Sequence, residues 1–146
     1  MKPTELKIVT VFESTEAFQN LDILHIHKLA SVATETEFEE GEIIHHAGDA
    51  GKAIYLIQAG EVAVEMDVVD YGLIRLFTLG PGHLFGWSSL FPTRRKQARI
   101  RVIQPTHAIA INASQLRDLF QADHKLEQAV MSCMTQAVLD RARLSY

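Results

Sequence analysis

One short segment of the chain carries most of the residue types that could bind a charged ligand. It contains Gly86, two serines at positions 88 and 89, and Lys96. A glycine before a single helical turn leaves backbone N–H groups and hydroxyls available to an anion. A lysine on a neighbouring strand could then supply the positive charge. The same residues also fit an ordinary surface turn with a solvated basic loop, and on residue types alone that simpler interpretation is preferred.

The elements that would position these residues can be read from the same segment. Residues 80–82, Gly-Pro-Gly, predict a turn. Residues 83–85 then predict a short strand, and residues 87–91 a single helical turn. Two arginines and a lysine at 94–96 form a loop, and the alternation of apolar and basic residues over 98–102 predicts a further strand.

The segment resembles the phosphate-binding cassette of the cyclic nucleotide-binding domain family, as found in the catabolite activator and the Fnr-type regulators. The family pattern is Phe-Gly-Glu-x-x-Leu, a loop, and then Arg-Ser/Thr-Ala-x-Val. Glycine-marked turns extend the resemblance over residues 18–119. The resemblance implies a cyclic nucleotide or a small anion as ligand, and it implies these contact residues: Phe85, Gly86, Trp87, Ser88, Ser89, Lys96, Gln97 and Ala98.

Two residues depart from the family pattern where it matters most for a nucleotide. Trp87 stands where the family has a glutamate for the ribose hydroxyl, and Lys96 stands where it has an arginine for the cyclic phosphate. Tryptophan offers one indole donor and no acceptor. Lysine lacks the planar guanidinium that grips a phosphate through two hydrogen bonds. These departures predict that cyclic AMP and cyclic GMP bind weakly or not at all, whereas a simpler anion could still bind.

Whole-chain composition excludes several classes of protein. A chain of 146 residues with 47% hydrophobic residues fits one soluble domain, and the net charge of −4 argues against a nucleic-acid binder. Five of the fourteen Lys and Arg lie between residues 94 and 101, so only this region is basic. The single cysteine, Cys133, rules out an internal disulfide and favours a cytoplasmic location. We expect no membrane span, because no apolar run approaches about 20 residues.

The spacing of short apolar runs predicts the fold class. About eight short strands over residues 34–112 predict an eight-stranded jelly-roll, or double-stranded β-helix, barrel. Helical segments flank it at residues 1–33 and 113–146, where Asp22 and Asp123 are candidate N-caps. We therefore expect a single mainly β domain over 1–146 and, since the sequence ends soon after the last helix, no DNA-binding domain.

The last predicted helix, residues 124–144, carries an apolar stripe at spacings of three and four. The stripe could pack on the barrel, or it could form a two-helix seam of the kind that family members use to dimerise. The second interpretation predicts a homodimer through this helix. The stripe consists of Leu126, Val130, Cys133, Ala137 and Leu144.

Three functions follow as alternatives. The first is a non-catalytic sensor with a ligand at the cassette. The second is a degenerate domain in which Trp87 fills the pocket and the chain serves as a dimerisation or protein-interaction module. The third, a cupin-like metal enzyme, needs a strand-borne His-x-His motif. His25 and His27 fall in a predicted helix, and His45 and His46 are neighbours on a strand that face opposite ways. We therefore predict no metal site and no catalysis, while haem held by a histidine stays open as a cofactor.

Overall fold

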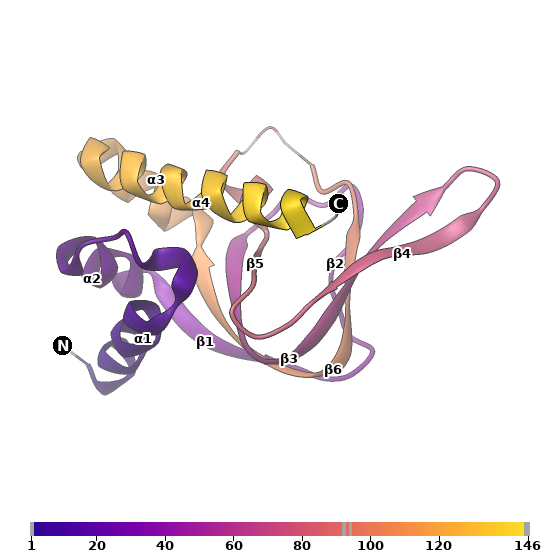
Figure 1. The fold of residues 1–146 in the computed structure, drawn as a ribbon, viewed down its shortest axis with the longest axis horizontal. Coiled ribbons are helices and arrows are strands. Elements are labelled where there is room, and N and C mark those ends of the chain that lie inside the picture. The colour runs from indigo at the N-terminus through magenta and orange to yellow at the C-terminus, as the bar shows by residue number, and fades with distance from the viewer. Residues whose placement is uncertain (1, 92, 94, 145–146) are drawn as a thin grey trace.

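The computed structural model describes residues 2–91, 93 and 95–144, with the side chains of all of these except 138 and 141–144. Figure 1 shows a curved β-sheet body with the helices gathered at one end and a long hairpin projecting from the other. The helices are α1 (Pro3–Ser14), η1 (Glu16–Phe18), α2 (Ile23–Ser31), η2 (Trp87–Leu90), α3 (Ala113–Ala122) and α4 (His124–Leu144). The strands are β1 (Ala33–Phe38), β2 (Ile43–His45), β3 (Ala53–Val68), β4 (Gly72–Leu79), β5 (Leu84–Phe85) and β6 (Arg99–Asn112).

All strand pairs are antiparallel, and β3 and β6 form the centre of the sheet. The order is β1-β6-β3-β4, with β2 on β6 and β5 on β3. Within the described residues the sheet therefore has six strands and is open, where the sequence predicts an eight-stranded barrel. The difference arises because β3 and β6 are long strands that each run through a point where the sequence pattern predicts a break.

The sequence predicts separate strands over residues 53–59 and 61–66 with Gly60 between them, whereas β3 continues through Gly60. The φ of Gly60 is +97°, and the register between β3 and β6 shifts on both sides of it. A Cβ at this position would lie 2.3 Å from the carbonyl oxygen of Pro105. The glycine thus bends the strand and lets β6 approach closely, so it marks a bulge rather than the end of a strand.

The predicted helix starts are confirmed by side-chain caps. The carboxylate of Asp22 accepts a hydrogen bond from the backbone N–H of His25 at 2.8 Å, and that of Asp123 accepts one from Leu126 at 3.0 Å. Asn112 caps α3 in the same way. Residues 6–12, which fit a strand or a helix in the sequence, are helical and bury an apolar face in the core.

The apolar stripe on α4 packs against the chain's own core. Leu126 is 0% and Val130 2% exposed, and both join the larger core cluster with Cys133. These three residues are therefore not available for a two-helix seam, and packing on the chain's own sheet and helices is the correct alternative for them. Ala137 is half-buried, and the Leu144 side chain lies outside the described residues. No helix in the described part of the chain is long and apolar enough to cross a membrane.

We expect Leu126→Ala to lower the free energy of unfolding by about 2–5 kcal/mol, because it opens a cavity in a fully packed site. Leu139→Ala is the matched control, since Leu139 lies on the same helix and is 48% exposed. It should change the stability by less than about 0.5 kcal/mol. Urea denaturation followed by circular dichroism measures both. Equal losses in the two variants would contradict the packing of α4 described above.

Candidate functional site

The ammonium group of Lys96 lies at the centre of the candidate site. The residue is only 7% exposed. Its Nζ donates to Ser89 Oγ at 2.9 Å and to the Gly86 carbonyl at 3.3 Å, and Ser89 Oγ in turn donates to the carbonyl of Ala53 on β3 at 2.9 Å. Burial lowers the pKa of Lys96. Because an ammonium has three N–H donors, one remains for a ligand after these two bonds.

Two glycines make this arrangement possible. Gly86 has φ +93°, and a Cβ there would lie 2.6 Å from the carbonyl oxygen of Ala53, so only glycine lets η2 start against β3. A Cβ at Gly51 would lie 2.1 Å from Ser89 Oγ and 2.7 Å from Lys96 Cε. Gly51 is thus required for the contact between Lys96 and Ser89. The sequence shows it only as a turn residue.

The backbone around Lys96 fixes the position of its side chain. The N–H of Lys96 donates to the Asp49 carbonyl at 2.9 Å, and the N–H of Gly48 donates to the Lys96 carbonyl at 2.7 Å. On the other side, Arg117 Nη1 on α3 donates to the Ser89 carbonyl at 2.7 Å. The cassette is therefore hydrogen-bonded to the turn after β2, to β3 and to a C-terminal helix.

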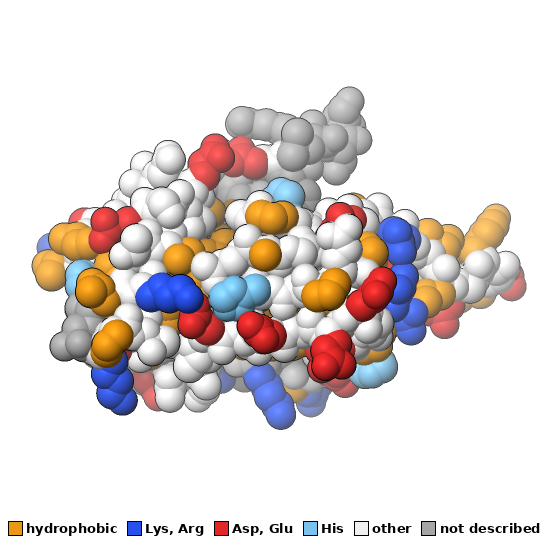
Figure 2. Space-filling view, turned by 90° about the horizontal axis from the view of Figure 1, so that it is seen from below, with side chains coloured by type: hydrophobic (Ala, Val, Ile, Leu, Met, Phe, Trp, Pro, Cys, Tyr) orange, Lys and Arg blue, Asp and Glu red, His pale blue; other side chains and the backbone are white. Residues whose placement is uncertain are grey.

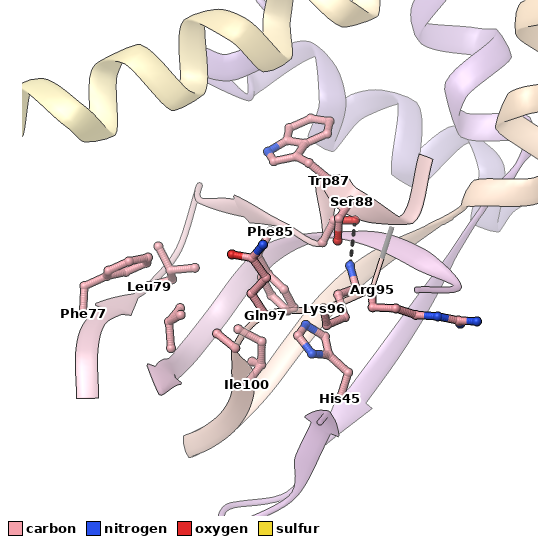
Figure 3. A pocket seen from close by; sticks show the side chains of 13 residues that line it. His45, Phe77, Leu79, Phe85, Trp87, Ser88, Arg95, Lys96, Gln97 and Ile100 are labelled. Carbon is pink, nitrogen blue, oxygen red and sulfur yellow. Dashed lines mark hydrogen bonds between the residues drawn. The ribbon is translucent and has the colours of Figure 1, made fainter. Parts of the chain in front are cut away.

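Beside these residues lies a cavity of about 690 Å³. It has an apolar end, continuous with the smaller core cluster. At the other end are the cations Lys96 and Arg95 and the imidazole of His45 (Figure 3). No carboxylate is among the described lining residues, which makes the cavity suited to an anion. They are His45, Val64, Phe77, Leu79, Phe85, Gly86, Trp87, Ser88, Arg95, Lys96, Gln97, Ala98 and Ile100.

The structure brings the predicted site residues together. Phe85, Gly86, Trp87, Ser88, Lys96, Gln97 and Ala98 all line the cavity. Ser89 does not; it is buried behind the cavity wall, where it holds Lys96 and β3. In the structure, Ser89 is connected to the cavity through its hydrogen bond with Lys96, and its contact with a ligand stays a prediction.

Trp87 does not occupy the cavity as the degenerate-domain hypothesis requires. Its side chain is half-buried and packs against the larger core cluster. Figure 3 shows the indole at the rim, turned away from Lys96. The position of the family glutamate is thus taken by a side chain that points elsewhere, and the space beside Lys96 stays open.

The sequence gives no sign that His45 lines this cavity, because an adjacent pair of histidines on a strand predicts only that the two side chains face opposite ways. The Nδ1 of His45 is buried and has no hydrogen-bond partner among the described residues. Burial, and next the charge of Lys96, lower the pKa of His45 to about 4. The described residues contain no group of three or more His, Cys, Asp or Glu side chains placed to hold a metal.

The basic run of the sequence divides between two sites. Arg99 and Arg101 on β6 lie outside the cavity lining and bind the buried Glu65 of β3, with Arg99 Nε 2.8 Å from Oε1 and Arg101 Nη2 3.1 Å from Oε2. The hydrogen bond from Arg101 is the main cause that holds the pKa of Glu65 below its usual value. The cassette's own charge is therefore carried by Lys96 and Arg95.

Comparison with known proteins supports the resemblance to the cyclic nucleotide-binding domain family. The chain is 31% identical over 87 residues to the cyclic AMP receptor protein of Thermus thermophilus, covering 60% of this chain and 37% of that protein. It is 25% identical over 129 residues to the cyclic nucleotide-gated channel alpha-4 of Mus musculus, covering 84% of this chain and 22% of the channel. The chain thus spans well under half the length of these curated relatives.

The fold is that of a solved cyclic nucleotide-binding domain from Methylobacillus flagellatus. The TM-score is 0.82 at 22% identity, and the match covers 97% of this chain and 80% of the other. The family model of the cyclic nucleotide-binding domain matches residues 35–123, which is more than half of the sequence and includes the whole cassette. On the evidence of its fold, its cassette and this match, the chain belongs to the cyclic nucleotide-binding domain family.

Proposed function

We propose that the cavity is a non-catalytic regulatory site that takes an anionic ligand with an apolar part, and that it binds cyclic AMP and cyclic GMP weakly or not at all. One observation carries the proposal: the cavity joins a buried, hydrogen-bonded ammonium to an apolar wall, and its described lining has no carboxylate. Family membership supports a regulatory role.

Anion binding follows from the state of Lys96. Two of its three N–H donors are used by Gly86 and Ser89, which hold the ammonium in one orientation. An anion that accepts the third meets a preorganised donor, so it does not have to order a long flexible side chain. Because the site is partly desolvated, the charge interaction is stronger there than it would be in water.

Weak binding of cyclic nucleotides follows from the two departures in the cassette. With Trp87 turned away, no carboxylate in the described lining can accept a hydrogen bond from a ribose hydroxyl. Losing a hydrogen bond to a charged acceptor costs about 1.5–3 kcal/mol. Lys96 retains the charge of the family arginine but makes no paired contact with the phosphate. If each change costs that much, the affinity for a cyclic nucleotide is roughly two to four decades lower than that of a cassette with the family's glutamate and arginine.

The proposed site has a direct route to the C-terminal helices. Arg117 on α3 donates to the carbonyl of Ser89, whose hydroxyl accepts from Lys96. A ligand that moves Lys96 would therefore also displace Ser89, whose carbonyl accepts the hydrogen bond from Arg117 of α3. The family's regulatory role requires such a connection between ligand and output.

A second candidate function, a dimerisation module, is favoured by the exposed hairpin of β3 and β4. Figure 2 shows hydrophobic side chains along this projection and basic ones at its base. Val69 is 83% and Tyr71 79% exposed, and Leu73 and Leu76 are about half exposed at 48% and 47%. Exposed apolar clusters of this kind mark contact surfaces.

Isothermal titration calorimetry with cyclic AMP tests the first proposal. We expect millimolar or undetectable affinity for the wild type, and a gain of about two to four decades for the double variant Trp87→Glu/Lys96→Arg. Trp87→Gln/Lys96→Arg is the matched control, because glutamine has the shape of glutamate without its charge, and its gain should be much smaller. Low-micromolar binding by the wild type, lost in Lys96→Ala, would overturn the proposal.

Sulfate binding tests the role of the ammonium. Lys96→Met keeps the aliphatic stem and removes the charge, so we expect sulfate affinity to fall at least about tenfold, the equivalent of a charged hydrogen bond. Lys52→Gln serves as the control, because it removes an exposed cation that does not line the cavity, and it should change the affinity by less than about threefold. Unchanged sulfate binding in Lys96→Met, with a normal melting curve, would exclude Lys96 as the anion contact.

Light scattering at micromolar concentration tests the second candidate. We propose a homodimer that Tyr71→Ser/Leu73→Ser dissociates without loss of folding, since both side chains are exposed. Leu139→Ser is the comparison, because Leu139 is the large exposed hydrophobic residue described on α4. Dissociation by Leu139→Ser alone would place the interface on α4, as the sequence predicts, and a monomeric wild type would rule out both surfaces.

A further inference from the structure

His45 lies in the cavity wall but belongs to no part of the cassette. It comes from β2, and Figure 3 shows its ring beneath Lys96, on the side of the cavity opposite η2. Its Nδ1 is buried and makes no hydrogen bond to any described residue. A buried polar nitrogen without a partner is costly, so the ring of His45 has unused hydrogen-bonding capacity at the cavity wall beside Lys96.

The groups that face His45 come from three segments. Burial and next Lys96 of the cassette loop lower its pKa, whereas Asp49 of the turn after β2 and a backbone hydrogen bond with Ala98 raise it; His46, the next residue, also lowers it. Arg95 lines the same end of the cavity. Burial and Lys96 outweigh Asp49, so the pKa of His45 is about 4 and its ring is neutral at pH 7.

We propose that His45 is a second anion-contacting residue of this cavity, which takes up a proton from solvent when an oxyanion binds between it and Lys96. The inference rests on the proposed anion site and adds its regulation. A bound oxyanion places negative charge beside the imidazole and offsets the charge of Lys96, which favours the imidazolium form. Both ring nitrogens are then donors, so the imidazolium can donate to an anion in the cavity.

The ligand class that fits is an oxyanion: a phosphate, sulfate or carboxylate group on a molecule with an apolar part. Lys96 and His45 approach from different segments, so they can grip two oxygens of one group. Such a site binds its ligand more tightly in mildly acidic conditions, and the ligand in turn makes the fold less sensitive to acid, because binding and protonation are linked.

Calorimetry with sulfate between pH 4.5 and 7.5 tests the inference, because sulfate keeps its charge over this range and any pH dependence comes from the protein. We expect the wild-type affinity to rise as pH falls from 7.5 toward 4.5, with a slope approaching tenfold per pH unit where binding takes up one proton. Titrations in two buffers of different ionisation enthalpy measure that uptake directly. His45→Gln should bind sulfate with no such slope.

Two variants separate His45 from its neighbours. His46→Gln is the matched control, since His46 is adjacent but exposed, and it should keep the wild-type slope. Asp49→Asn removes the carboxylate that faces His45, and it should also keep a slope, which shows that protonation of Asp49 is not its source. Circular dichroism at each pH confirms folding, and His45→Asn replaces His45→Gln if the latter does not fold.

Stability without ligand gives an independent readout. The folded pKa of His45 lies below its unfolded value of 6.5, so the unfolded chain binds the proton first. Without sulfate, the melting temperature should therefore fall as pH decreases from 6.5 toward 4, and less steeply in His45→Gln. Saturating sulfate should raise the wild-type melting temperature more at pH 5 than at pH 7.

The possible outcomes distinguish a failure of the inference about His45 from a failure of the proposed anion site. Sulfate binding that depends on Lys96 but not on pH would overturn the role of His45 and leave the anion site in place. The absence of sulfate binding at every pH, in a wild-type protein that melts normally, would overturn both. A slope that disappears in His46→Gln and persists in His45→Gln would show that His46, not His45, takes up the proton. That result would overturn the inference.

Discussion

Burial of the Lys96 ammonium is the constraint on which the rest of the site depends. A charge removed from water is costly unless polar partners replace its hydration. Here the Gly86 carbonyl and the Ser89 hydroxyl are those partners, and Ser89 is itself bonded to Ala53 on β3. The positive φ of Gly86 and the missing side chain at Gly51 are needed for the same contacts. The local fold of the cassette therefore depends on one feature, an ammonium held in a single position.

The same contacts connect the cavity to the helical end of the molecule. Arg117 reaches from α3 to the Ser89 carbonyl, and α3 is followed by α4, whose start is fixed by Asp123. Asp123 also binds Lys28 of α2, so the N-terminal and C-terminal helices meet at one residue. Because the apolar face of α4 is used within the chain, any signal that leaves the domain must pass through surfaces that remain exposed. The hairpin of β3 and β4, with exposed Val69, Tyr71, Leu73 and Leu76, is one of these surfaces.

The distribution of charge decides what the cavity can hold. Arg99 and Arg101 follow Lys96 closely in the sequence, but strand alternation turns them to the other face of the sheet, where Glu65 neutralises part of their charge. The cavity keeps Lys96 and Arg95, with His45 neutral at pH 7. The proposed preference for an amphipathic anion rests on Lys96 and the cavity's apolar wall, and the proposed weak binding of a ribose rests on Trp87 in place of a glutamate.

Local patterns in the sequence determined the helix starts at Asp22 and Asp123, the turn at residues 80–82 and the cassette residues, because caps, turns and glycine spacing depend on neighbours in the chain. The continuity of β3 through Gly60 was decided only by the tertiary structure, since a glycine at a bulge and a glycine at a strand end look alike in sequence. The tertiary structure also decided three further features: the packing of the α4 stripe against the chain's own core, the place of His45 in the cavity wall, and the orientation of Trp87. Each of these depends on which distant segment packs against the residue, and a pattern within one strand or helix carries no information about that partner.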